Sequence, residues 1–526
     1  DARCTQIAAF NLALTAWKFC GHYKALPEMN LACSGIAPKG KVEDWVKLVG
    51  NVPRDDRGRM ENGMKMLYEH FQLAPELGSL LDPTTIKADA FTASFEELQP
   101  VLKRALENEG DTEQLERGVM AAGIAKAGQL LAKKYSLQIT NVPYLGKGKF
   151  DTVLSDYVLK HYADAKGDLA TVFMERLLKT AQPHGTVTTV IPQNWLFLTT
   201  YKKYREKLLK SETWNVVARL GAGAFSQISG EVVKAILIAI THTKPNPDHP
   251  LTGLDVSDAP NAIAKDEALK TAELKMVNQK EQLGNPDAVV AFENIKSDKL
   301  LNNYSYSHHG LTSGDLPRMS MFFWELGTVD DKWIPFQTTT KKTQYYSGLE
   351  TMLRWENGKG AINELPGARK DGTAAWGRKG IVISQIGEMP TALYLGYSFD
   401  NNTAVITPND DKDLEAIWSY CSSPEYNEAV RRIDQSLAVT SGTMVKIPFE
   451  LDYWKKIASE KYPNGLPKPY SDDPTQCLFH GHPIKTENPL QVALARVLGY
   501  RWPAESDTEM ELAEEARELI AAVKAF

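Results

Sequence analysis

Between residues 135 and 241 the chain alternates short apolar segments with amphipathic segments of helical length, and this alternation limits the fold more than any other feature. Short apolar runs rich in β-branched residues favour strands, whereas apolar residues spaced three and four apart favour helices. Strands separated by helices are typical of a mostly parallel α/β sheet, in which ligands bind at the carboxyl ends of the strands. The predicted order is strand 135–140, helix 167–181, strand 186–192, a helix over about 200–210, and strands in "WNVVARLG" and "EVVKAILIAIT".

The first predicted strand ends in Asn141-Val142-Pro143-Tyr144, which places a side-chain amide, a proline and an aromatic ring at a strand terminus. An exocyclic aromatic amine such as adenine N6 is a poor nucleophile, because its lone pair is delocalised into the ring. An Asn side-chain oxygen and a backbone carbonyl can hold both of its N–H groups and favour a tetrahedral nitrogen, while an aromatic face stacks on a base flipped out of the duplex. Taken alone, the same four residues also fit an ordinary strand-end turn.

"NVPY" resembles the Asn-Pro-Pro-Tyr motif of the N6-adenine DNA methyltransferases that use S-adenosylmethionine. The following "GDLATVFMERLLKTAQPHGTVTTVIPQNWLFLTTYKKYREKLL" is similar to the helix-strand-helix that comes after this motif in TaqI-like, gamma-class enzymes. "RLGAGAFSQISGEVV" resembles their LG-x-x-x-F element, whose Phe helps to hold the flipped adenine and falls on Phe225. The resemblance implies a Rossmann-like methyltransferase domain, with a catalytic site formed by Asn141, Val142, Pro143, Tyr144 and Phe225.

From about residue 301 the composition of the sequence changes, and aromatic residues, glycines and lysines are interleaved. The segments "GLTSGDLPRM", "FFWELG", "LRWENGKG" and "VTSGTMVKIPF" resemble the target-recognition domains of single-chain restriction-modification methylases and of BREX or DISARM phage-defence adenine methylases. We predict a catalytic domain over 1–245 with a helical insertion at about 42–134, a helical connector over 246–300, an α/β target-recognition domain over 301–450 and a carboxyl-terminal helical region over 451–526.

The chain departs from the family pattern at two places. Val142 stands where the family has a first proline, but the group used at this position is the backbone carbonyl, which valine keeps. Its β-branching and the following proline still favour an extended conformation. The glycine-rich cofactor loop and the acid for the cofactor ribose, which in the family precede the first helix, are missing, so we expect an amino-terminally incomplete domain. The resemblance leaves Asp1, Cys33, Ser34 and Asn141 as candidate contacts to S-adenosylmethionine, with Cys33 and Ser34 in a short strand and turn predicted over 30–38.

Cationic side chains suggest where DNA is contacted. The net charge of −6 argues against a chain coated in basic charge but allows a local basic cleft. Lysines next to glycines and aromatics suit contacts to phosphates and groove edges, although a run of charge is also typical of a solvated surface. The predicted contacts to double-stranded DNA are Lys147, Lys149, Lys341, Lys342, Arg354, Arg369, Lys370 and Arg378, whereas Arg176 and Lys179 are predicted surface charges.

Other classes of site and location are disfavoured. The five cysteines form neither a disulfide framework nor a pair with metal-ligand spacing, and "CLFHGH" has no second Cys/His pair, so we expect no metal and a reducing cytoplasm. No apolar run approaches the ~18 residues of a membrane span, and no P-loop, H-E-x-x-H or G-x-S-x-G motif is present.

The sequence therefore predicts a site-specific DNA adenine N6-methyltransferase of restriction-modification or phage defence, acting with S-adenosylmethionine and with or without other subunits of such a system. Two alternatives stay open. One is a DNA-recognition or scaffold subunit with impaired catalysis, motivated by Val142 and the missing cofactor loop. The other is methylation of RNA or of a protein glutamine, since the motif suits any planar amide or amine, but the large second domain favours DNA.

Overall fold

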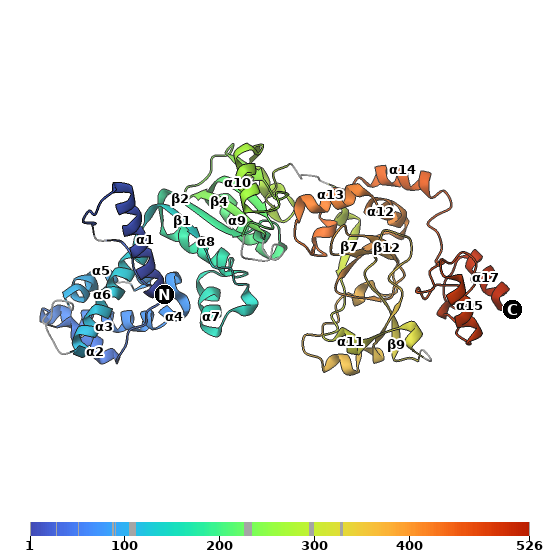
Figure 1. Ribbon diagram of the computed structural model, residues 1–526, viewed down its shortest axis with the longest axis horizontal. Helices are drawn as coiled ribbons and strands as arrows, with labels where there is room; N and C mark the ends of the chain where they lie inside the picture. The colour runs from blue at the N-terminus through green and yellow to red at the C-terminus, as the bar shows by residue number, and fades with distance from the viewer. Residues whose placement is uncertain are drawn as a thin grey trace. The chain divides into compact units, whose positions relative to one another are not determined.

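The computed structural model describes residues 2–524 apart from 28, 51, 87, 88, 90, 105–111, 226–233, 294–298 and 327–329. The chain divides into two compact units (Figure 1). Unit 1 consists of Asp1–Gln193 and Glu206–Gln279, and unit 2 of Asn194–Arg205 and Lys280–Phe526. Both units combine helices with sheets, which confirms the predicted α/β class.

Unit 1 is built on a six-stranded sheet with the order β1-β2-β4-β3-β5-β6. Among the described strands, the β1–β2 and β3–β5 pairs are parallel, whereas β4 is antiparallel to both neighbours and β6 is antiparallel to β5. The prediction of a mostly parallel sheet is therefore wrong, because a buried strand reads as an apolar run whichever way it points. The strands are β1 (Tyr135–Asn141), β2 (Ala181–Pro192), β3 (Thr213–Gly221), β4 (Ala235–Thr241), β5 (Pro250–Asp255) and β6 (Lys275–Asn278).

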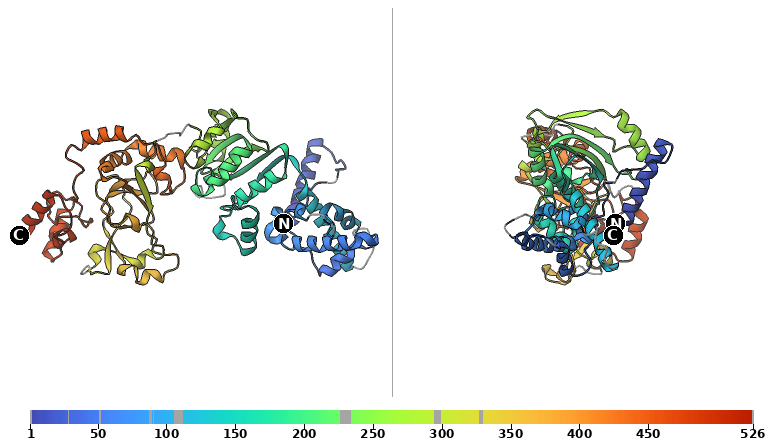
Figure 2. Two further views of the ribbon diagram at one scale, coloured as in Figure 1. Left: turned by 180° about the vertical axis from the view of Figure 1, so that it is seen from behind. Right: turned by 90° about the vertical axis from the view of Figure 1, so that its left-hand side faces the viewer.

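The helices predicted beside these strands are present, with small shifts at their ends. Helices α2 to α6 occupy the predicted insertion and gather in a bundle beside the sheet (Figure 2). The predicted strand over 30–38 is wrong, since this segment is irregular and lies against the bundle, with Gln72 donating to the Pro38 carbonyl at 2.9 Å. The helices are α1 (Ala2–Cys20), α2 (Val42–Val46), α3 (Arg54–Gln72), α4 (Ala74–Leu77), α5 (Phe95–Arg104), α6 (Thr112–Ala132), α7 (Thr152–His161), α8 (Leu169–Thr180), α9 (Lys202–Ser211) and α10 (Ala262–Thr271).

Arg176 on α8 joins this helix to the bundle and is not a surface charge. Its guanidinium donates to Asp82 Oδ2 at 3.0 Å and to two backbone carbonyl oxygens, and the Arg176 side chain is only 5% exposed. Lys179 holds its ammonium 4.1 Å from the centre of the Tyr162 ring. The surface prediction is therefore wrong for Arg176, whose partners are distant in sequence, whereas Lys179 is exposed as predicted.

The sheet of unit 1 extends past the predicted catalytic boundary at residue 245. Strands β5 and β6 flank α10, and β5 pairs with β3 from Val216↔Thr252 to Arg219↔Asp255. The segment expected to be a helical connector over 246–300 therefore contributes two strands and one helix to unit 1, as far as Gln279.

Unit 2 contains two four-stranded sheets with the orders β13-β9-β10-β8 and β12-β11-β14-β7. Their strands are β7 (Ser305–His309), β8 (Ser320–Phe322), β9 (Trp333–Gln337), β10 (Thr351–Arg354), β11 (Gly380–Ser384), β12 (Thr391–Tyr394), β13 (Ser398–Phe399) and β14 (Thr403–Pro408). The helices are α11 (Leu316–Met319), α12 (Leu414–Cys421), α13 (Pro424–Ile433), α14 (Leu451–Lys461), α15 (Pro489–Val497), α16 (Pro503–Ser506) and α17 (Glu514–Lys524).

Segment 194–205 is part of unit 2 and contains Arg205, whose side chain is fully buried. Its guanidinium donates to the carbonyl oxygens of Trp195 and Leu198 at 2.6 and 2.8 Å. It also donates to those of Asp287 and Ala288 at 2.8 and 3.2 Å. A buried cation needs such partners, so Arg205 ties the segment to the chain that follows residue 280.

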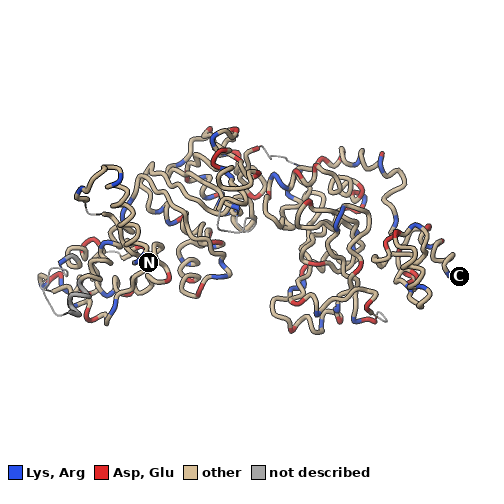
Figure 3. Tube along the Cα trace, in the orientation of Figure 1, with Lys and Arg blue, Asp and Glu red and all other residues tan. Residues whose placement is uncertain are grey.

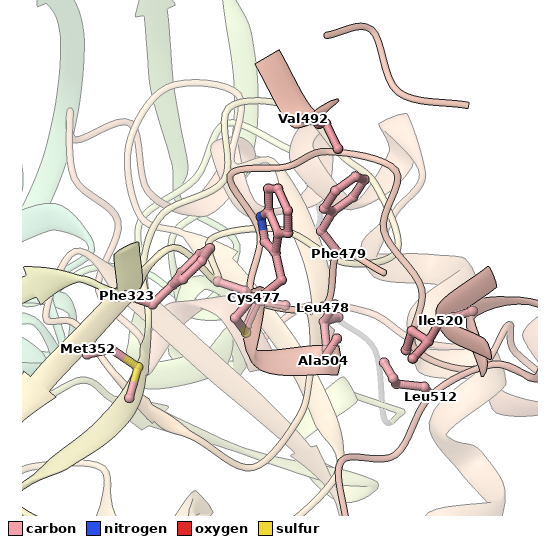
Figure 4. Packing of buried hydrophobic residues seen from close by; sticks show 12 residues of the cluster. Phe323, Met352, Cys477, Leu478, Phe479, Val492, Ala504, Leu512 and Ile520 are labelled. Atoms are coloured by element: carbon pink, nitrogen blue, oxygen red, sulfur yellow. The ribbon is translucent and has the colours of Figure 1, made fainter. Parts of the chain in front are cut away.

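The carboxyl-terminal region packs on the part of unit 2 around β10. One apolar cluster joins Phe323, Leu349 and Met352 to residues from Cys477 onward (Figure 4). The predicted helical region over 451–526 contains α14 to α17, but irregular segments connect them and supply much of the cluster, including Leu478 and Phe479.

Candidate functional site

The NVPY loop lies at the carboxyl end of β1. Asn141 is the last residue of the strand and is exposed, whereas Val142 is buried, so the side chain of Val142 anchors the loop. The Tyr144 hydroxyl donates to Asn141 Oδ1 at 3.4 Å. Burial, with a smaller contribution from the nearby Asp168 carboxylate, raises the pKa of Tyr144 to about 12, so the phenol stays protonated at neutral pH.

Backbone hydrogen bonds tie the NVPY loop to the start of α8. The Leu169 N–H donates to the Leu145 carbonyl at 2.9 Å, and the Lys147 N–H donates to the Gly167 carbonyl at 3.1 Å. Asp168 is the N-cap of α8, and its Oδ1 accepts a hydrogen bond from the backbone N–H of Ala170 at 2.9 Å. Burial raises the pKa of Asp168, while hydrogen bonds from the backbone N–H groups of residues 145 and 170 act in the opposite direction. One carboxylate therefore holds both the helix and the loop.

Phe225 approaches the loop from the turn after β3. Its ring centre lies 6.3 Å from that of Tyr144, with the two planes at 65°, an edge-to-face arrangement. The turn passes through Gly221 and Gly223, whose φ angles of 65° and 75° favour glycine. The structure therefore brings Asn141, Tyr144 and Phe225 together, although more than 80 residues separate the two rings in the sequence.

A cavity of about 470 Å³ opens beside the motif. Asn141, Val142 and Pro143 line it together with Ser34, whose hydroxyl lies 3.1 Å from the Ser79 hydroxyl. The candidate cofactor residues Ser34 and Asn141 thus border one space. Cys33 is not among the lining residues, and Asp1 lies outside the described residues.

Sequence reasoning missed two residues at this site. Ser79 and Phe173 line the cavity, and Phe173 is only partly buried. Asp168 clamps the loop and was not among the predicted site residues. The dipeptide Gly-Asp before an apolar helix is a recognisable N-cap signal, and it could have identified Asp168.

The predicted DNA contacts fall into groups with different local partners. Figure 3 shows acidic and basic residues interspersed along the trace. Lys147 and Lys149 are exposed on the loop that follows the motif, in the short helix Lys147–Lys149. In unit 2, Lys341 and Lys342 are exposed, and no ion pair is found for either among the described residues. The others have partners of their own: Arg354 pairs with Glu356 and Arg369 with Asp371, Lys370 lies over Trp355, and Arg378 donates to the Pro408 carbonyl.

In the described part of the chain, no cluster of three or more His, Cys, Asp or Glu side chains has an arrangement that could bind a metal ion. No helix among these residues combines the length and the apolar character needed to cross a bilayer.

Comparison with protein families confirms the predicted resemblance. Residues 1–225 match the family described as Eco57I restriction-modification methylase. The adenine-specific methyltransferase BrxX of Escherichia coli O9:H4 (strain HS) is 27% identical over 403 residues, which cover 72% of this chain and 32% of the relative. The adenine-specific methyltransferase PglX of Lacticaseibacillus casei (strain Zhang) is 25% identical over 374 residues, which cover 62% of this chain and 30% of the relative.

The chain thus spans about a third of the length of the curated relatives that it matches. Among solved structures, the Type IIL restriction-modification enzyme MmeI in complex with DNA aligns with a TM-score of 0.42 and 13% identity, over 74% of this chain and 57% of that one.

Proposed function

On the premise that residues 1–225 match the Eco57I restriction-modification methylase family, we propose that this protein methylates the N6 amino group of adenine in DNA. The observation that carries the proposal is the convergence of Asn141, Tyr144 and Phe225 at the carboxyl end of β1. Together they offer an amide oxygen and two aromatic rings to one small volume. The names of both curated relatives, adenine-specific methyltransferases, support the same reaction.

Asn141 and the Val142 carbonyl would act on the amine. Each accepts one N–H of the adenine amino group, which draws the nitrogen toward a tetrahedral geometry and localises its lone pair for attack. Fixed acceptors of this kind stabilise the positive charge that develops on the nitrogen during transfer. The buried side chain of Val142 holds its backbone in place without the ring restraint of a proline.

Tyr144 and Phe225 would hold the base after it leaves the duplex. Stacking on an aromatic side chain contributes about 1–3 kcal/mol per base, which offsets part of the cost of unstacking. The neutral phenol of Tyr144 also donates to Asn141 Oδ1, and so keeps the amide oxygen oriented toward the base.

The cavity beside the motif fits part of S-adenosylmethionine, which supplies the methyl group when bound. Its apolar walls suit the adenine ring of the cofactor, and the Ser34 hydroxyl can bond to a ring nitrogen or amine. The amide of Asn141 borders both this space and the proposed base site. No carboxylate lines the cavity among the described residues, so the ribose hydroxyls find no acidic partner there.

The reaction is tested by incubating the full-length protein with DNA and S-adenosylmethionine, and by measuring N6-methyladenine through nucleoside mass spectrometry. We expect N6-methyladenine at one sequence context, which modified-base sequencing of cellular DNA would identify. DNA binding without any adenine methylation would instead support a recognition subunit with impaired catalysis. A methylated RNA or protein, with unmodified DNA, would contradict the proposed substrate.

Removal of the Asp168 clamp should slow methylation. In the Asp168→Ala variant, α8 loses its N-cap and the Leu145 N–H loses its acceptor, so we expect a fall in kcat of on the order of 10-fold and a stability loss of about 1 kcal/mol. Asp151→Ala is the matched control, because Asp151 caps α7 through the Leu154 N–H at 2.8 Å. Equal kcat values in the two variants would show that the clamp has no role beyond capping.

We propose that unit 2 recognises DNA, with Lys341 and Lys342 on phosphates. Each phosphate contact contributes about 0.9 to the slope of log K against log salt. The double variant Lys341→Gln/Lys342→Gln should therefore reduce this slope by about 1–2. Lys270→Gln, which removes an exposed lysine paired with Asp266 and Glu267, should leave it unchanged. An unchanged slope in the double variant would place the DNA elsewhere.

The biological role that these properties suit is marking of the cell's own DNA in restriction-modification or phage defence. A DNA substrate implies action in the cytoplasm, alone or with other subunits of such a system. The specific activity that we propose is that of a site-specific DNA adenine methyltransferase, the class EC 2.1.1.72.

A further inference from the structure

Lys265 on α10 is a buried cation outside the part of the chain that matches the methylase family. Its side chain is 2% exposed. The ammonium donates to the carbonyl oxygens of Val256, Ser257 and Ala259 at 3.2, 3.2 and 2.5 Å. Burying an ammonium is costly unless its protons are all bonded, and here one turn supplies all three acceptors. Lys265 therefore fixes the turn over 256–261.

The same turn lies against the glycines that lead to Phe225. A Cβ atom on Gly221 would come within 2.8 Å of the Ser257 Cβ, and one on Gly223 within 2.7 Å of the Pro260 carbonyl oxygen. These distances are below any normal contact, so the backbone at 221–223 touches the turn directly. The Val256 N–H also donates to the Arg219 carbonyl at 3.0 Å.

We propose that Lys265 is a positioning residue for the capture of the target base: it holds turn 256–261 against Gly221 and Gly223 and so sets Phe225 opposite Tyr144. The inference rests on the proposed methylation, and it assigns part of the base site to a helix that the family match does not reach. If the turn loosens, the glycine segment loses its support and the Phe225 ring loses its fixed distance of 6.3 Å from Tyr144.

An alternative role for Lys265 is that it only stabilises the sheet. A matched variant distinguishes this role from the positioning of Phe225. Gln279 is also fully buried and makes three hydrogen bonds, to the Leu209 and Glu212 carbonyls and from the Trp214 N–H, at the opposite end of β3. Gln279→Leu should therefore reduce stability without moving Phe225, whereas Lys265→Met should do both.

The test is a double-mutant cycle on full-length protein, with unmethylated DNA that contains the sequence in which the protein methylates adenine. We expect Lys265→Met and Phe225→Leu each to lower kcat by on the order of 10-fold, and the double variant to be hardly slower than Phe225→Leu alone, because the ring to be positioned is already gone. Lys265→Arg, which keeps the donors, should recover part of the rate. Gln279→Leu should keep the kcat of the unaltered protein.

The outcomes are distinct. The positioning role would be overturned if the kcat losses of the two single variants multiplied in the double variant. It would also be overturned if the Lys265→Met protein had the same kcat as Gln279→Leu. If Lys265→Met does not fold, Gly223→Ala tests the same contact from the other side, and independent losses with Phe225→Leu would again overturn it. Failure of the unaltered protein to methylate adenine would overturn the proposed function itself, so the two failures are distinguishable.

Discussion

Asn141→Ala is expected to abolish adenine methylation, with kcat reduced by at least on the order of 100- to 1000-fold. Asn141 supplies the only side-chain oxygen of the NVPY motif at the end of β1 apart from the phenol of Tyr144. Without it, one N–H of the adenine amine has no acceptor, and the nitrogen keeps its planar, unreactive geometry. The measurement is single-turnover methylation at saturating DNA, which reports chemistry rather than product release.

DNA binding should survive this change, because Asn141 is exposed and its side chain is not part of the core. Asn215→Ala provides the matched control, since Asn215 on β3 donates to the Thr241 hydroxyl at 2.8 Å and lies away from the motif. We expect the control to keep its rate. A normal rate in Asn141→Ala would remove the basis of the catalytic assignment.

Arg176→Met should produce the largest loss of stability, about 3–5 kcal/mol in the free energy of unfolding. The substitution keeps much of the apolar stem but removes the guanidinium that donates to Asp82 Oδ2 and to the carbonyls of Leu81 and Leu131. Removing one member of a buried pair is costly because the remaining charge stays desolvated. Denaturant unfolding followed by circular dichroism would give the difference.

The Arg57→Met variant serves as the comparison, because Arg57 forms an exposed pair with Glu61 one turn along α3. Pairs of this type contribute little in water, so we expect almost no change in the unfolding midpoint. Similar losses in both variants would mean that Arg176 does not join α8 to the helical bundle.

The sequence was sufficient to predict the elements with strong local patterns. The strand ending at Asn141, helix α8 and strands β2 to β4 lie close to their predicted positions, since apolar periodicity and turn residues act over short distances. The position of the NVPY loop at the end of β1 could be predicted for the same reason, because its residues directly follow the strand in the chain.

Features set by distant contacts were not predictable. The direction of β4, the buried partners of Arg176 and the contact of Gly221 and Gly223 with a turn beyond residue 255 depend on segments that meet only in the folded protein. The irregular segment over 30–38 has the pattern of a strand, but its polar groups bond to the helical bundle, as in the bond from Gln72 to the Pro38 carbonyl. Tertiary contacts thus override local preference at these places.

If unit 2 recognises DNA as proposed, segment 194–205 affects how this unit could be exchanged between related proteins, because the segment belongs to unit 2 but precedes the last part of unit 1 in the sequence. A cut after Gln279 would separate segment 194–205 from the rest of unit 2. The segment contains the buried residues Trp195 and Leu196, and it would lose the chain after residue 280 to which the Arg205 hydrogen bonds tie it. A recombination event that replaces only the sequence after residue 280 would join mismatched surfaces. Under the proposed role of unit 2, a new DNA specificity would be transferred only when residues 194–205 are replaced with it, or when both parents already share them.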